Sequence, residues 1–146
     1  MSDKIIKRAV EIIALNTVNG GEYTGQNCIL ALIDLEGYPT ASVISASKAE
    51  GITKIWLCTG LASDKAKRLE KCQNASICFA SAEYNITLVG KIEVSIDQDI
   101  KNEMWYPALS MHFSGADDPN YCVLCFTTHR YNLLVDWEET KGYINI

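Results

Sequence analysis

Between residues 86 and 96, apolar residues alternate with mostly polar ones. This alternation is typical of one kind of secondary structure. Every second residue is apolar or glycine: Ile86, Leu88, Gly90, Ile92, Val94 and Ile96. Because successive side chains of a strand point to opposite faces, the pattern predicts one long strand with one buried face. Gly90 stands inside the apolar row, and a glycine there marks a bend or a close approach of another backbone.

Most of the remaining chain is also typical of strands. We predict strands over residues 28–34, 38–46, 53–59, 75–82, 121–127 and 132–136, with a short one at 142–146. The turn residues Leu35–Gly37 make a hairpin of the first two. Helices are predicted over 3–16, over 63–72 and after Asp97. Six or seven mostly antiparallel strands with a few flanking helices predict a mainly β (α+β) barrel, because closure removes exposed sheet edges.

Length and charge limit the classes of function. The 146 residues suit a single domain, 1–146. The net charge of −5 argues against nucleic-acid binding. No apolar run reaches the ~20 residues of a membrane span, and the N-terminus lacks the apolar core of a signal peptide. We therefore expect a cytoplasmic protein that contacts no membrane.

The six cysteines of the chain are expected to be reduced thiols without a metal. Cys122 and Cys125 have CxxC spacing, but no second such pair exists, and neither histidine has ligand spacing with them. The pair also falls in a predicted strand, where residues three apart point to opposite faces.

Residues 56–68 contain the strongest local indication of a ligand site. A strand ends at Thr59, a loop of small residues follows, and Ser63 is placed to cap the helix that carries Lys65 and Lys67. The first amides of a helix have no acceptor within it and attract anions, so this segment suits a phosphate group. The other interpretation is an ordinary capped helix with a solvated basic face, and the residues alone do not decide between them.

Two further features have both a functional and a structural interpretation. The segment Gly37–Ala46 is rich in small side chains, which let a flat ring lie close to a backbone or simply pack beneath a helix. The aromatic residues include Trp105 and Trp137, and such side chains serve cores and interfaces more often than cofactors. No nucleophile motif or paired acid and base is present.

Taken in order, several short motifs resemble the pyridoxamine 5′-phosphate oxidase-like family of FMN-binding split barrels, and within it the general stress protein 26 group. They are Asp34-x-x-Gly37-x-Pro39, Thr59-x-x-x-Ser63-x-Lys65, Gly90-Lys91-x-Glu93, Trp105-Tyr106-Pro107, the run from His112 to Asn120, and Asp136-Trp137.

The resemblance implies an antiparallel split barrel that forms a homodimer with FMN at the interface. By the same resemblance the flavin follows the strand Ser42, Val43, Ile44 and Ser45, and its phosphate is held by Thr59, Ser63 and Lys65. Asn85 reaches the flavin from the second protomer, and Trp105 and Trp137 form the wall of the pocket.

The function expected from the resemblance is that of an FMN-dependent oxidoreductase with a small-molecule electron donor or acceptor. The C-terminal Arg and His motif of true pyridoxamine-phosphate oxidases is missing, so vitamin B6 oxidation is not expected. Two alternatives remain: a non-catalytic flavin-binding stress-response protein, and a binder of another phosphorylated ligand such as a deazaflavin.

Overall fold

The computed structural model describes residues 2–19 and 27–144 of the chain. Three α-helices and a short 3₁₀ helix accompany the strands: α1 (Ser2–Leu15), α2 (Asp64–Lys71), α3 (Gln98–Met104) and η1 (Pro107–Met111). The strands are β1 (Cys28–Ile33), β2 (Pro39–Ile44), β3 (Ala46–Glu50), β4 (Lys54–Gly60), β5 (Asn74–Ala80), β6 (Tyr84–Ser95), β7 (Tyr121–Val135) and β8 (Glu138–Tyr143).

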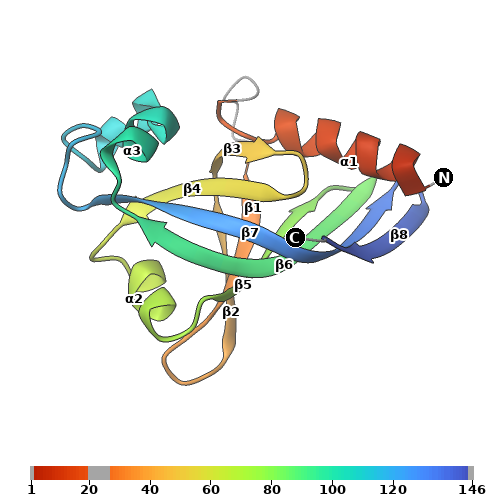
Figure 1. Cartoon of the computed structure of the whole chain (residues 1–146), viewed down its shortest axis with the longest axis horizontal. Helices are drawn as coiled ribbons and strands as arrows, with labels where there is room; N and C mark the ends of the chain where they lie inside the picture. The colour runs from red at the N-terminus through yellow and green to blue at the C-terminus, as the bar shows by residue number, and fades with distance from the viewer. Residues whose placement is uncertain (1, 20–26, 145–146) are drawn as a thin grey trace.

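One antiparallel sheet forms the body of the molecule, and its strand order explains its curvature. The order is β2-β1-β5-β6-β7-β4-β3, with β8 added to β7. The two strands at the ends of this path, β2 and β3, are consecutive in the chain and are separated by Ser45 alone. The sheet must therefore curl until its ends meet at Ser45, and the result is the half-open barrel seen in Figure 1. The prediction of an antiparallel split barrel is confirmed.

The structure corrects the predicted strands in three places. Residues 46–50 form β3, which the sequence reading missed because Ser47, Lys48 and Glu50 give no apolar alternation. The two strands predicted at 121–127 and 132–136 are one strand, β7, and the last strand lies at 138–143 instead of 142–146. The hairpin of β1 and β2 and the helix caps at Ser63 and Asp97 are confirmed.

Gly90 is the point where β6 and β7 come closest. Val89 pairs with Arg130 and Gly90 with Thr128, so β7 has an extra residue, His129, in a β-bulge. A methyl group on Gly90 would overlap the backbone carbonyl of Thr127. The predicted close approach is thus confirmed, and only glycine fits it.

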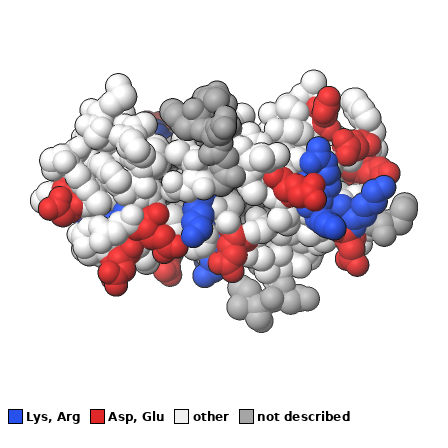
Figure 2. Space-filling model, turned by 90° about the horizontal axis from the view of Figure 1, so that it is seen from above, with Lys and Arg blue, Asp and Glu red and all other residues white. Residues whose placement is uncertain are grey.

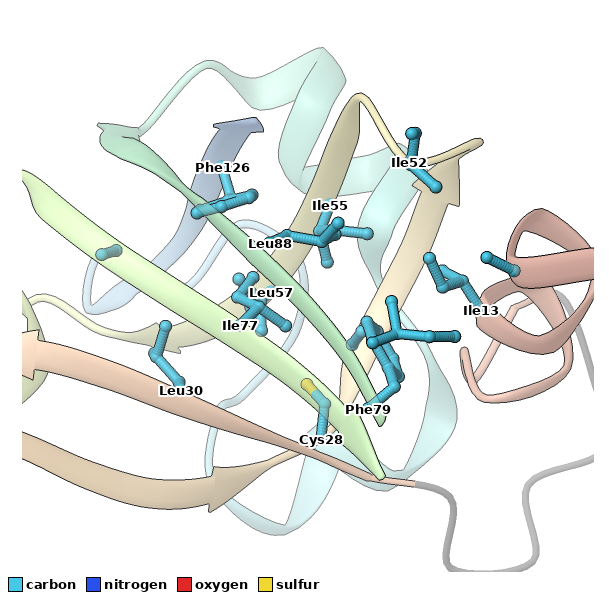
Figure 3. Close-up of a cluster of buried hydrophobic side chains, with 14 of the residues drawn as sticks. Ile13, Cys28, Leu30, Ile52, Ile55, Leu57, Ile77, Phe79, Leu88 and Phe126 are labelled. Atoms are coloured by element: carbon cyan, nitrogen blue, oxygen red, sulfur yellow. The ribbon is translucent and has the colours of Figure 1, made fainter. Parts of the chain in front are cut away.

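The barrel encloses a single apolar core, and a smaller cluster lies at one end. The core contains, among others, the residues labelled in Figure 3, from Ile13 on α1 to Phe126 on β7. The second cluster lies beneath α3 and η1 and is built around Tyr121. Its buried members are Cys58, Met104, Leu109, Phe113, Tyr121 and Val123. No helix among residues 2–19 and 27–144 is long and apolar enough to cross a membrane.

Candidate functional site

A hollow of about 550 Å³ lies where β4 ends, between the start of α2 and the segment around η1. In Figure 1 these elements lie in the left-hand part of the molecule, with α2 below the end of β4 and α3 above it. The volume is within the range of small-molecule sites. The lining residues are Ser45, Cys58, Thr59, Gly60, Ala62, Ser63, Tyr106, Ala108, Leu109, Met111, His112, Phe113 and Asn120. We call this hollow the end pocket.

The start of α2 gives the end pocket a set of hydrogen-bond donors. The Ser63 hydroxyl oxygen accepts from the amide of Ala66 at 3.2 Å and from the Thr59 hydroxyl at 3.1 Å. With both lone pairs engaged, the proton of Ser63 is left to donate to a ligand. The amides of Asp64 and Lys65 are in the first turn and have no acceptor within the helix. This donor set suits an anionic oxygen ligand such as a phosphate.

Asn120 holds the loop that connects β4 to α2. Its side-chain oxygen accepts from the amide of Ala62 at 3.0 Å, and its backbone carbonyl accepts from the amide of Leu61 at 2.6 Å. A Cβ atom on Gly60 would lie 2.8 Å from the Asn120 side-chain nitrogen. Glycine at position 60 therefore lets the loop and Asn120 pack together, which fixes the direction of the α2 amides.

The opposite wall of the end pocket is anchored by two charged side chains, Asp118 and Lys101, which both have hydrogen-bond partners. The Asp118 carboxylate accepts from the amides of Ser114 and Asn120, both at 2.9 Å, and these bonds lower the pKa of Asp118. The buried ammonium of Lys101 donates to the Asp118 carbonyl at 3.0 Å and lies over the Tyr121 ring. Helix α3 and the loop after η1 are thereby held together.

Cys58 lies at the base of the end pocket and is a packed thiol. Its sulfur is 3.5 Å from the Tyr121 hydroxyl and donates to the Met104 carbonyl at 3.6 Å. Burial raises the pKa of Cys58 to about 11, so the thiolate needed for nucleophilic attack is scarce at neutral pH. We assign it no covalent role.

The structure brings only part of the predicted site together. Ser45, Thr59 and Ser63 all line the end pocket, although Ser45 belongs to the barrel seam and the others to the end of β4 and its loop. Lys65 lies half-buried in the first turn of α2, beside the pocket instead of in its lining.

The strand that precedes Ser45 runs away from the end pocket. Ser42 and Ile44 pair with Leu30 and Cys28, whose side chains are in the core, whereas Val43 pairs with Ile29 on the outer face. All three lie outside the pocket lining of the single chain.

The remaining predicted residues are not on the wall of this pocket. Asn85 pairs with Leu134 at one end of β7, whereas the pocket lies near Tyr121 at the other end. Trp137 lies in the turn that follows Val135, at the same end of β7 as Asn85, and is 83% exposed. Trp105 is half-buried in the second cluster, with its ring 5.3 Å from that of Tyr121, so it supports the wall from behind.

Sequence reasoning missed the residues that the segment 106–120 contributes to the pocket. Tyr106, Leu109, His112 and Phe113 come from η1 and the residues beside it. Short 3₁₀ segments have no periodicity that a sequence pattern can detect, and the two family motifs in this region, Trp105-Tyr106-Pro107 and the run from His112 to Asn120, gave these residues no role in a pocket. Asn120 stood out in the sequence as a turn residue and as the last residue of a family motif, but not as a residue of the pocket.

None of the described residues forms a cluster of histidine, cysteine or acidic side chains able to hold a metal ion. All six cysteines lie within the described part of the chain and are free thiols. Of the pair with CxxC spacing, Cys122 is buried and Cys125 is half-buried.

An antiparallel split barrel with a donor-lined pocket at its open end defines the structural class of this protein. The pyridoxamine 5′-phosphate oxidase family model matches residues 24–134, and the chain belongs to that family. Its sequence is similar to general stress protein 26 of Bacillus subtilis, with 26% identity over 96 residues, which cover 62% of this chain and 68% of the relative. The predicted family is thus confirmed.

Solved structures share the fold over almost the whole chain. A protein from Clostridium acetobutylicum related to general stress protein 26 superimposes with a TM-score of 0.80 and 23% identity, covering 99% of this chain and 97% of the other. A pyridoxamine 5′-phosphate oxidase-related, FMN-binding protein from Nostoc punctiforme gives a TM-score of 0.65 at 16% identity, with coverage of 95% and 97%. Both comparisons support the fold.

Proposed function

We propose that this protein binds FMN in the end pocket and acts as an FMN-dependent oxidoreductase on a small molecule. The observation that carries the proposal is the convergence of Ser45, Thr59 and Ser63 on one pocket whose free donors suit a phosphate. The local sequence around Thr59 and Ser63 and the family resemblance indicate the same phosphate position. Family membership and the FMN-binding protein of the same fold support the same ligand.

We further propose that the working form is a homodimer in which each pocket is completed by the other chain. Asn85 and Trp137 lie at the same end of the sheet, far from the end pocket of their own chain. A second chain related by a two-fold axis would therefore place both residues at the end pocket of the first. The outer face of β1 and β2 offers an apolar surface for such a partner. On it, Val43 is 64% exposed and stands opposite Ile29, and Ala31 stands opposite Ala41.

Each group of residues has a defined part in this proposal. FMN supplies the electron-transfer chemistry when bound. Ser63 and the first amides of α2 bind its phosphate, Lys65 balances part of the phosphate charge, and the base of the pocket excludes water. No side chain of the lining is placed as a strong acid or nucleophile, so the protein's part is to bind, orient and shield.

The first test separates phosphate recognition from ring recognition. Lys65→Ala is expected to weaken FMN about tenfold, which corresponds to 1.4 kcal/mol, and to leave riboflavin, which has no phosphate, unchanged. The measurement is fluorescence titration of flavin-free protein with each ligand, after the visible spectrum of the purified protein has been taken.

Lys67→Ala is the matched control for that test, because Lys67 lies on another side of α2, in a hollow shared with Asp34, Glu36 and Asp64. It should bind FMN as the wild type does. Equal losses for FMN and riboflavin in Lys65→Ala would refute the phosphate assignment.

A second prediction concerns the turn that presents Trp137. Asp136 and Trp137 have φ angles of 52° and 66°, as in a type I′ turn, where Asp-Gly is the preferred pair. Trp137→Gly should therefore raise the stability of the fold by about 1 kcal/mol, yet weaken FMN binding, because the indole no longer reaches the partner's pocket. Calorimetry and FMN titration measure the two effects.

Trp137→Phe keeps an aromatic ring and the strained backbone, so it should retain most of the FMN affinity without the gain in stability. If Trp137→Gly binds FMN as tightly as the wild type, Trp137 is not part of a flavin pocket.

A third measurement separates an enzyme from a non-catalytic flavin carrier. Reduced flavin on an enzyme is reoxidised by its acceptor faster than free reduced FMN is, whereas on a carrier it is not.

A further inference from the structure

The two walls of the end pocket differ in chemistry. One wall is formed by β4 and the loop before α2, and it carries the polar groups Thr59, Ser63 and Asn120. The other wall is formed by residues 106–113 and is apolar or aromatic. Its side chains are Tyr106, Ala108, Leu109, Met111, His112 and Phe113. A flavin bound along the first wall, as proposed above, therefore exposes its other side to an apolar surface.

No lysine, arginine, aspartate or glutamate belongs to the described lining of the end pocket. Four other hollows in the described part of the chain each include charged side chains, such as Lys91 and Arg130 in the hollow over β5 and β6. In Figure 2 the largest cluster of Lys and Arg lies at the end that carries α1, away from α3. The described lining of the end pocket thus differs from that of these four hollows in having no fixed charge, since Asp118 and Lys101 anchor one wall without being part of the lining.

Met111 stands at the mouth of the apolar wall and is 81% exposed. An unbranched thioether adapts its shape to different apolar ligands, and such residues are frequent on surfaces that accept several of them. Beneath Met111 and His112, the wall is backed by the second cluster: Phe113 packs against Tyr121 with 5.3 Å between ring centroids. A firm aromatic base with an adaptable rim suits binding of apolar molecules.

We infer that the apolar wall of the end pocket selects an uncharged, apolar small molecule as the reaction partner of the flavin. This inference rests on the proposed function and names its substrate class. A phosphate or carboxylate on that molecule would lose its hydration against residues 106–113 and find no lysine or arginine there to replace it. Phosphorylated substrates, pyridoxamine 5′-phosphate among them, are therefore excluded by the same wall.

The test uses two probes with one ring system, 2-naphthol and 2-naphthyl phosphate, on protein saturated with FMN so that the phosphate site is filled. Binding is measured as the change in the flavin absorption spectrum. The wild type should bind 2-naphthol at least about tenfold more tightly than the phosphate. Equal or tighter binding of the phosphate would overturn the inference.

Met111→Lys supplies the missing cation at the rim, and the exposure of Met111 means that the fold should tolerate it. This variant should bind 2-naphthyl phosphate more tightly and lose most of the selectivity. Met111→Gln changes polarity without charge and should keep the selectivity of the wild type. An unchanged selectivity in Met111→Lys would place the probe elsewhere and refute the inference.

The outcomes also separate this inference from the proposal on which it rests. A wild-type protein that takes up no FMN contradicts the proposed function. A protein that binds FMN but does not prefer 2-naphthol contradicts only the substrate class.

Discussion

Gly90→Ala is expected to lower the free energy of unfolding by roughly 3–5 kcal/mol, a large part of the stability of a typical domain. The added methyl would overlap the Thr127 carbonyl and lie 3.1 Å from the Thr128 Cα, and both are backbone atoms of the neighbouring strand. Backbone inside a sheet cannot move aside as a flexible side chain can, so the β6–β7 pairing must open at the bulge. Thermal unfolding and urea titration measure the loss.

Gly37→Ala is the control for backbone strain alone. Gly37 has a φ of 92°, and nothing lies within 4 Å of a Cβ built on it. An alanine there pays only the conformational cost, on the order of 1 kcal/mol. If Gly90→Ala loses no more stability than Gly37→Ala, the close approach of the two strands is not what requires glycine.

Val43→Glu is expected to convert the proposed dimer to a monomer and, with it, to abolish tight FMN binding. In the dimer, Val43 would be covered by the partner, and a buried carboxylate without a cation is costly. We expect at least a hundredfold weaker association, about 2.7 kcal/mol. Since Val43 is exposed in the single chain, the monomer itself should fold normally. Sedimentation at micromolar concentration and FMN titration measure the two effects.

Leu15→Glu places the same charge on another exposed apolar position, on α1 instead of on β1 or β2. It should leave both assembly and FMN binding as in the wild type. A Val43→Glu protein that sediments as a dimer and binds FMN normally would show that the second chain does not use this face.

Several parts of the fold could be predicted because their causes are local. Alternation over residues 86–96 predicted β6, since a strand with one buried face needs that pattern. Ser63 and Asp97 predicted the starts of α2 and α3, because a capping side chain bonds to amides only three residues away. Gly90 was marked as a close approach, although the strand that approaches it could not be named.

The parts that could not be predicted depend on residues distant in the chain. Strand β3 has no apolar alternation and exists because β4 pairs with it from Ala46 to Glu50. Asn120 was an ordinary turn residue until β7 placed it against the loop before α2. For the same reason, Asn85 and Trp137 could be assigned to a flavin but not to a place in the molecule.

By itself, then, the sequence determined most of the strands and the capped helix starts, because short-range periodicity and hydrogen bonding produce them, and it indicated residues 59–65 as a candidate phosphate site. Only the tertiary structure decided where the barrel opens and what lines its open end. That outcome follows from the strand order, which brings β2 and β3 together at Ser45 and sets residues 106–120 opposite Thr59 and Ser63. Such contacts arise from sheet closure, and no local pattern specifies them.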